Sequence, residues 1–370
     1  MTLSDHAIFA ADGVYRPILR ARRGEVLALH HLDPQSAHRV LPILELSIPA
    51  RDTAHEAVDL MRLLHDARPR SPAIAIDVGN LPDPADPLRS APLEVAEDLG
   101  EHGVSMVPVV RPHDSGRRLA EHGLAARIHN QHALLRLRPA DTPGPLALGA
   151  VVDRVLRGTG LSPEEFDLVL DLAETGCHAG VDRVEEQARR TLRWAHGRRW
   201  RSVSVAAGAM PANLDDLPTD QPVEVERWDR RLIARLADTG AGYADYGVTS
   251  PVRRGGLHHR QLPTLRYTDE ASWWIYRWAR RGGRGDDRCH DLCRALLASP
   301  QWPAAGARFS WGDAEIARRA RTARGAGTPA NWIAWSTSHH IAQVLSSGQL
   351  QPRPRQPGTR SPIRRHTGRR

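Results

Sequence analysis

Residues 105–138 read SMVPVVRPHDSGRRLAEHGLAARIHNQHALLRLR, and this stretch decides the fold class of the chain. It begins with a short apolar run at 105–111, continues with an amphipathic pattern at 115–125 and ends with a second apolar run at 132–138. A strand, a helix and a second strand in that order are typical of the βαβ unit, in which the two strands lie parallel. We therefore predict an α/β protein built around a parallel sheet.

The same alternation continues on both sides of this stretch. Eight apolar runs are predicted as strands, at residues 14–22, 40–48, 72–78, 105–111, 132–138, 166–172, 200–207 and 242–248. Helical patterns lie between them at 53–67, 93–102, 115–125, 146–157, 181–196 and 223–238. Eight strands with intervening helices favour a closed (β/α)8 barrel, and an open doubly wound sheet is the alternative.

The pattern changes after the eighth strand. A Gly- and His-rich loop at 253–263 is followed by an aromatic segment at 264–279, which we expect to mix an extended piece with a helix. Three further helices are predicted at 287–298, 311–321 and 332–345. We predict a barrel over residues 1–250, a helical extension packed on it over 251–350, and a disordered Arg- and Pro-rich tail over 351–370.

Composition excludes several classes of protein. All 51 basic residues counted as Lys+Arg are arginine, so neither a Schiff-base lysine nor a P-loop lysine is present. No apolar run reaches the length of a membrane span, and the first residues lack the pattern of a secretory signal, so we expect a cytoplasmic protein without membrane contact. The net charge of +8 is mostly local, because seven arginines lie in residues 351–370 without an acid; removing them leaves +1.

Charged residues recur where the predicted strands end, and ligands of β/α barrels bind at that face. Side chains alternate faces along a strand, and a charge facing the surrounding helices would be costly, so we place these charges in the inward mouth of the barrel. The predicted substrate-binding residues are Arg20, Arg22, Arg111, Arg136, Arg138 and Asp245. The predicted catalytic residues are Glu45, Asp77 and Asp171. Arg–Asp pairs that only neutralise one another are the structural alternative.

Two segments of the C-terminal part contain residues of types that can bind metal ions. Cys289, His290 and Cys293 resemble a metal-binding pattern, but no second ligand pair follows at zinc-finger spacing, so buried helix cysteines are favoured. His339 and His340 lie in an apolar helical pattern and point about 100° apart, which favours structural histidines over two ligands of one metal.

Several short motifs together resemble the bacterial and phage beta protein family. The resemblance runs over about residues 14–345. Its motifs are Tyr15-x-Pro17-x-Leu19-Arg20-x-Arg22-x-Gly24-Glu25, Leu41–Glu45, Asp245-Tyr-Gly247, Arg266-Tyr-Thr268, Phe309–Asp313 and His339-His340. The resemblance carries no established activity and hence no catalytic residues. It implies a role in phage–host biology.

Two functional hypotheses follow from the residues. In the first, the arginines of the mouth hold a small anionic, phosphorylated ligand, and the carboxylates supply acid–base chemistry or hold a divalent metal. Replacing Glu45 or Arg136 should then abolish activity and leave stability nearly intact. In the second, the chain is a non-enzymatic interaction protein whose basic tail contacts nucleic acid or an acidic partner.

Overall fold

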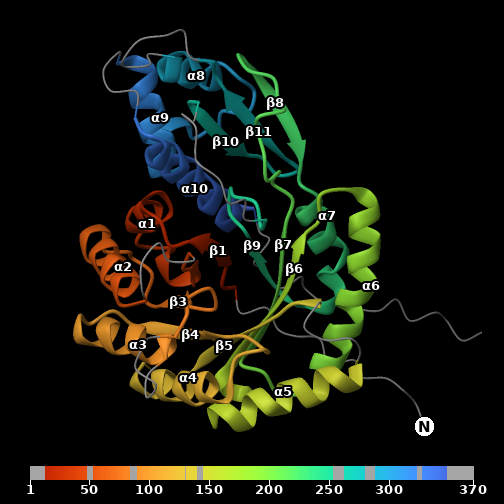
Figure 1. The fold of residues 1–370 in the computed structure, drawn as a ribbon. Helices are drawn as coiled ribbons and strands as arrows, with labels where there is room; N and C mark the ends of the chain where they lie inside the picture. The colour runs from red at the N-terminus through yellow and green to blue at the C-terminus, as the bar shows by residue number, and fades with distance from the viewer. Residues whose placement is uncertain are drawn as a thin grey trace, which may run out of the picture.

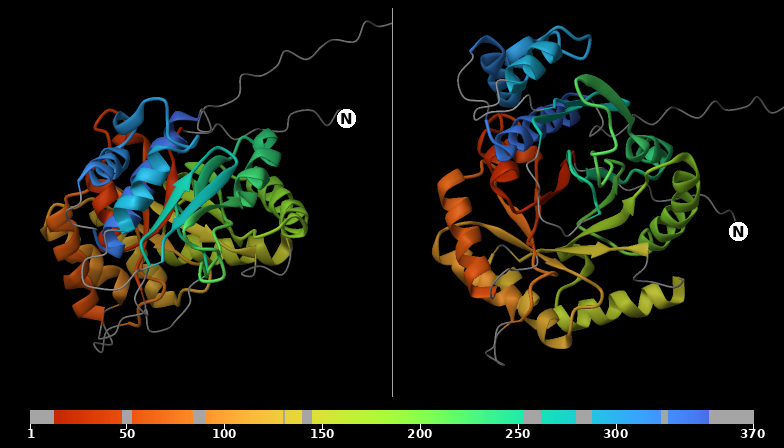
Figure 2. Two further views of the ribbon diagram at one scale, coloured as in Figure 1. Left: turned by 90° about the horizontal axis from the view of Figure 1, so that it is seen from above. Right: turned by 45° about the horizontal axis from the view of Figure 1, so that its top comes forward.

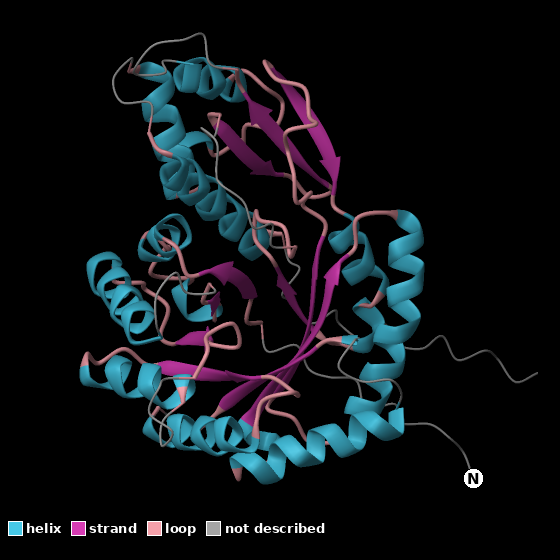
Figure 3. Cartoon of the chain, viewed as in Figure 1, coloured by secondary structure: helices cyan, strands magenta, loops and turns pink. Residues whose placement is uncertain are grey.

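The computed structural model describes residues 13–47, 53–83, 90–129, 131–139, 145–252, 262–279, 288–322 and 327–347. Eight parallel strands close into a barrel in the order β1-β2-β3-β4-β5-β6-β7-β9 (Figures 1 and 3). They are β1 (Arg16–Arg20), β2 (Ile43–Glu45), β3 (Ile74–Asp77), β4 (Met106–Val110), β5 (Ala133–Leu137), β6 (Phe166–Glu174), β7 (Ser202–Gly208) and β9 (Gly242–Asp245). The prediction of a (β/α)8 barrel is confirmed, and the open-sheet alternative is wrong.

A ring of helices surrounds the barrel (Figure 2). It contains α1 (Arg23–His30), α2 (Thr53–Ala67), α3 (Ala91–Glu101), α4 (Gly116–Ile128), α5 (Pro145–Thr159), α6 (His178–Ala195), α7 (Trp228–Arg235) and α10 (Pro329–Ser346). Short 3-10 turns lie at Ala37–Arg39, Pro163–Glu165, Ala237–Thr239 and Gly306–Arg308. Helix α1 has no counterpart among the predicted helices, because it has only eight residues and follows β1 almost directly.

The last helix of the ring comes from the far end of the chain. Helix α10 packs along α1 and occupies the place of the helix that should follow the eighth strand of the barrel. Gly24 makes this approach possible, since a Cβ at that position would lie 2.8 Å from the carbonyl oxygen of Ala330. The segment between β9 and α10 is therefore an insertion within the barrel's eighth βα unit.

The insertion builds an accessory unit beside the barrel, together with one strand from before residue 250 (Figure 1). Its antiparallel sheet has the order β10-β11-β8, and two helices cover one face. The elements are β8 (Gln221–Glu226), β10 (Thr264–Thr268), β11 (Ser272–Arg277), α8 (Arg288–Leu297) and α9 (Trp311–Arg321). Strand β8 comes before residue 250 but belongs to the accessory unit, and α10 comes after residue 250 but belongs to the ring around the barrel. The barrel and the accessory unit are therefore not separated by a single boundary at residue 250.

Two predictions are partly wrong in the region of this sheet. The segment predicted as one helix over 223–238 contains the end of β8 and then α7, and the aromatic segment 264–279 forms the hairpin of β10 and β11. The reason is that the apolar side chains of these segments alternate with a period of two residues, which is the period of a strand and not of a helix. Trp273 and Ile275 pack with Val223 and Val225 on one face, while Tyr276 packs on the other.

The middle of the barrel is filled by apolar side chains from all eight strands: Ile18, Ile43, Ala75, Val107, Val109, Leu134, Val169, Ala206 and Ala244. Toward the N-terminal ends of the strands, Arg16 Nη2 lies 3.3 Å from Asp167 Oδ1, and both side chains are buried. The apolar layer separates this pair from the charges at the C-terminal ends. Any ligand at the mouth therefore rests on a packed floor and not in a pore.

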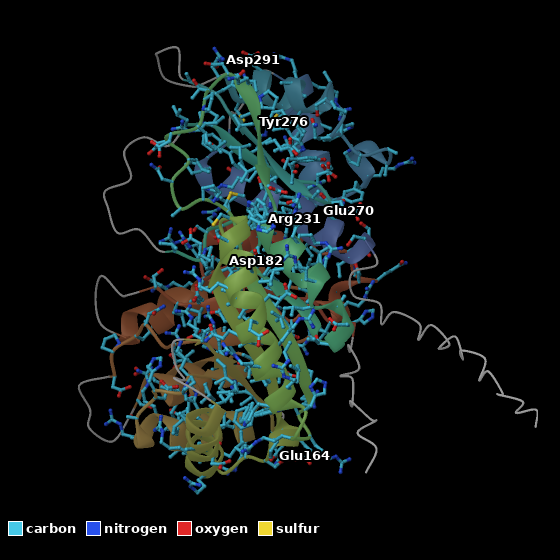
Figure 4. All side chains as sticks on the ribbon, turned by 90° about the vertical axis from the view of Figure 1, so that its right-hand side faces the viewer. Glu164, Asp182, Arg231, Glu270, Tyr276 and Asp291 are labelled. Atoms are coloured by element: carbon cyan, nitrogen blue, oxygen red, sulfur yellow. The ribbon has the colours of Figure 1, made fainter. Side chains whose placement is uncertain are left out.

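The molecule is elongated by the accessory unit. Glu164, just before β6, and Asp291, on α8, lie at its opposite ends (Figure 4). Within the described ranges, no helix is both long and apolar enough to cross a membrane. The predicted tail 351–370 and most of the predicted loop 253–263 lie outside the described residues.

Candidate functional site

Arg136 of β5 is the centre of an ion network inside the barrel mouth. Its Nη1 donates to Glu45 Oε1 and to Asp77 Oδ2, each at 2.7 Å, and its Nε donates to Asp171 Oδ2 at 2.9 Å. The Arg136 side chain is 1% exposed. One guanidinium thus holds three carboxylates from β2, β3 and β6, and its hydrogen-bonding fork is directed at protein groups.

Strand register explains why the acids meet. Glu45 and Asp77 are register partners on neighbouring strands, and both end their strands facing inward. Two adjacent carboxylates repel one another in a buried site unless a cation lies between them. Arg136 provides that cation from β5, which is separated from β3 by one strand in the barrel order.

Two further arginines, Arg111 and Arg138, bind the outer side of the same carboxylates. Arg111 donates to Asp77 Oδ2 from Nε at 3.3 Å and from Nη2 at 2.9 Å. Arg138 Nε donates to Asp171 Oδ2 at 2.8 Å. The Arg111 and Arg138 side chains are 12% and 41% exposed, so these two arginines, unlike Arg136, reach the surface of the mouth.

The two aspartates are fully engaged by protein donors. Asp77 Oδ1 accepts from the Gly79 backbone N–H, and Asp171 Oδ1 accepts from the backbone N–H of Ala173. Burial by itself would raise the pKa of Asp77, but the Arg111 and Arg136 guanidiniums outweigh it and hold that pKa well below its usual range. Arg136 and Arg138 likewise outweigh burial and lower the pKa of Asp171. Both carboxylates are therefore ionised and positioned, and their catalytic role stays a prediction.

Tyr246 completes the network, although it is not among the site residues predicted from the sequence. Its hydroxyl donates to Asp171 Oδ1 at 2.6 Å and accepts from Arg136 Nη2 at 3.0 Å. Burial, reinforced by the Asp171 charge, raises the pKa of this hydroxyl, so it stays protonated and can donate. The alternation of side chains along β9 could have predicted this position, because Ala244 and Tyr246 share the inward face.

A cavity of about 200 Å³ opens above this network. It is lined by Glu45, Asn80, Arg111, Arg138 and Pro251. The Arg111 guanidinium lies so close to the backbone of residue 79 that a Cβ there would clash with it, so glycine at this position allows Arg111 to reach Asp77. The cavity thus has two oriented guanidiniums and two oxygen-bearing side chains in its wall.

The remaining predicted arginines lie outside this cavity's lining. Arg20 is half-buried, and its Nη2 is 3.4 Å from the carbonyl oxygen of Ser250. Arg22 is exposed before α1 and lines a larger cavity of about 380 Å³ between the β1 and β2 ends and α2, together with Arg23 and Asp59. We assign the candidate site to the smaller cavity because the buried charges converge there.

The prediction that Asp245 faces the mouth is wrong. Its side chain points outward from β9 and is buried against α10, where His340 Nε2 lies 2.8 Å from Asp245 Oδ2. Tyr15 and Tyr243 donate hydroxyl hydrogen bonds to the carboxylate at 2.5 and 2.9 Å. The expected cost of an outward charge is offset because these donors, the Gly247 N–H and the nearby Arg227 guanidinium surround it.

This outward cluster joins the barrel to the accessory unit. His340 Nδ1 lies 2.9 Å from Thr268 Oγ1 on β10, while the adjacent His339 lies 3.0 Å from Asp313 Oδ2 on α9. Tyr267 donates to Asp313 Oδ1 at 2.6 Å. Most motifs on which the family resemblance rested therefore meet at this junction, and both histidines have partners that hold elements together.

Glu25, in the first turn of α1, is a buried acid outside both clusters. Burial raises its pKa to about 7, although Arg20, Arg22 and Arg266 act in the opposite direction. Burial and the neighbouring Arg20 charge lower the pKa of Arg266 to about 10. Burial thus destabilises the charged forms of both side chains.

Replacing Glu25 by glutamine is expected to stabilise the protein by about 2–3 kcal/mol at pH 8.5 and to have little effect at pH 4.5. The folded-state pKa is raised, so the wild-type protein loses stability as pH rises from about 4.5 to about 7. Urea unfolding at both pH values measures the difference. Glu164→Gln, an exposed change, is the control, and an equal effect of both substitutions at pH 8.5 contradicts this reading.

Among the described residues, no group of three or more His, Cys, Asp and Glu side chains is arranged to hold a metal ion. Cys289, His290 and Cys293 are buried on α8, and His290 Nδ1 lies 2.8 Å from the Arg319 carbonyl oxygen.

Fold and site together define a TIM-type barrel whose mouth carries a buried arginine–carboxylate network and whose eighth βα unit contains an accessory sheet and helices. The model of the family described as Beta protein matches residues 15–346, so the chain belongs to that family. A search of curated proteins finds no match.

Proposed function

We propose that the protein binds a small molecule through a carboxylate or phosphate group held between Arg111 and Arg138. The observation that carries this proposal is the cavity of about 200 Å³ whose wall contains both guanidiniums, each oriented by an aspartate. A guanidinium presents a planar fork of donors that matches carboxylate and phosphate oxygens. The floor of buried, ion-paired groups supports this role, because a preorganised site does not have to order its side chains on binding.

Within this proposal the arginines have different roles. Arg136 holds the acids and so shapes the mouth, while Arg111 and Arg138 contact the ligand. Glu45 lines the cavity and is the acid best placed for proton transfer, if the bound molecule reacts. The alternative of an interaction protein that uses its basic tail stays a prediction, as do the phage–host role and the cytoplasmic location.

The test is the thermal unfolding midpoint with inorganic phosphate, compared with chloride at equal ionic strength. Phosphate is expected to raise the midpoint of the wild-type protein, and Arg138→Ala should weaken binding by roughly 10- to 100-fold, as for a lost hydrogen bond to a charged group. Arg201→Ala is the matched control, because Arg201 is also half-exposed and lies 3.9 Å from a buried aspartate, Asp167, at the other end of the barrel. An equal phosphate response in all three proteins would overturn the proposal.

A further inference from the structure

The charge balance of the mouth constrains the ligand beyond its anionic group. The network contains three arginines and three carboxylates: Arg111, Arg136, Arg138, Glu45, Asp77 and Asp171. Each arginine can be matched with one acid, so these six residues are neutral together. An anionic group between Arg111 and Arg138 would lie close to the carboxylates that these arginines already bind, and close to Glu45, which lines the same cavity. Like charges in a partly buried site repel one another unless a cation lies between them.

The cavity wall also contains acceptors on the side of β2 and β3. Glu45 lines the cavity, with its Oε1 bound to Arg136 Nη1. Asn80 lines it too, and its Nδ2 donates to the Leu46 carbonyl at 2.9 Å, which orients the amide oxygen away from that carbonyl. Glu45 and Asn80 therefore offer a carboxylate and an amide to the same cavity, while the two arginines follow β4 and β5.

We propose that the ligand of this cavity is a small zwitterion, with its anionic group between Arg111 and Arg138 and an ammonium group against Glu45 and Asn80. An ammonium group presents three donors and no acceptor, which suits a carboxylate and an amide oxygen. The ammonium group of the zwitterion offsets the repulsion between the ligand's anionic group and Glu45, which a simple phosphate or carboxylate does not do. This inference rests on the proposed function and adds the second half of the ligand to it.

The test uses two matched series of probes and measures their affinities by calorimetry. Phosphoethanolamine, 2-hydroxyethyl phosphate and propyl phosphate share a phosphate and differ only in an ammonium, hydroxyl or methyl end. β-Alanine, 3-hydroxypropionate and butyrate are the same series on a carboxylate, so the two series distinguish the two anionic groups. In at least one series the ammonium compound is expected to bind roughly 10- to 100-fold more tightly than its methyl analogue.

Glu45→Gln is the decisive variant. Glutamine has the same shape as glutamate and keeps an oxygen that can accept from Arg136, but it removes one negative charge from the network. The variant is expected to lose the preference for the ammonium compound and to bind propyl phosphate or butyrate more tightly than the wild-type protein does. A merely destabilised protein would bind every probe more weakly, so the crossover separates the two explanations.

The outcomes distinguish the two proposals. If the methyl and ammonium compounds bind equally and both depend on Arg138, the proposal of a zwitterionic ligand is wrong and the proposed anion site is supported. If none of the six probes and no inorganic phosphate binds the wild-type protein, both the proposed function and the zwitterionic ligand are wrong.

Discussion

Replacing Arg136 by methionine is expected to lower the free energy of unfolding by about 3–5 kcal/mol, because it leaves buried carboxylates without their shared cation. Glu45, Asp77 and Asp171 all bind this guanidinium, and the two aspartates are fully buried. From the sequence, Arg136 was expected to contact a ligand and to be dispensable for stability. The three ion pairs of the buried Arg136 side chain lead to the opposite expectation, namely that Arg136 is needed for stability. Urea unfolding at pH 7 measures the change.

Arg138→Met is the matched control for this experiment. It removes the same charge from the same network, but Arg138 is 41% exposed and Asp171 keeps Arg136, Tyr246 and Ala173 as donors. Its expected cost is below about 1 kcal/mol, as for other exposed pairs. If the two substitutions cost the same, the central role assigned to Arg136 is wrong.

Replacing Asp245 by asparagine is expected to cost about 2–3 kcal/mol at pH 7, and the cost should disappear in acid. Burial would raise the pKa of Asp245, but His340 and Arg227, together with the hydrogen bond from Tyr15, hold it at about 2. The unfolded value is about 3.9. Because the folded pKa is the lower one, the stabilisation is complete above about pH 5, declines as pH falls and is lost below about pH 2.

Unfolding by urea between pH 7 and pH 2.5, for the wild-type protein and the Asp245→Asn variant, measures this profile. The two curves should converge toward the acid end. Asp66→Asn, at an exposed position of α2, serves as the control and should follow the wild-type curve throughout. A constant difference between wild type and Asp245→Asn across this range would show that the effect comes from geometry and not from the ionised carboxylate.

Most of the barrel could be predicted because its signals are local. Alternating apolar runs and helical patterns give the order of strands and helices, and parallel strands with helical connections permit few arrangements. The accessory sheet was harder. Val223 and Val225 alternate with glutamates in β8, which comes directly before helix α7. A single helical pattern was therefore predicted across a strand and a helix. Helix α10 could not be assigned to the barrel ring, because the sequence does not show that it returns to α1.

The sequence predicted which residues meet at the candidate site better than it predicted what each of them does there. Strand ends and side-chain alternation placed Glu45, Asp77, Arg136 and Asp171 together, since the C-terminal ends of parallel strands meet at one face. The same reasoning failed for Asp245. The outward face of β9 meets the buried Tyr15 and, from α10, His340, and both of these partners lie far from it in the sequence.

Local patterns in the chain are enough to predict the strand–helix alternation, to exclude lysine chemistry and to place charges together at one end of the barrel. They do not show which arginine is enclosed by acids and which lines a cavity, because that depends on the folded arrangement. The physical reason is that ion pairing depends on distances of a few ångströms and on burial, because the attraction between charges grows as water is excluded. Barrel closure, strand register and the return of α10 set those distances, and no local pattern in the chain records them.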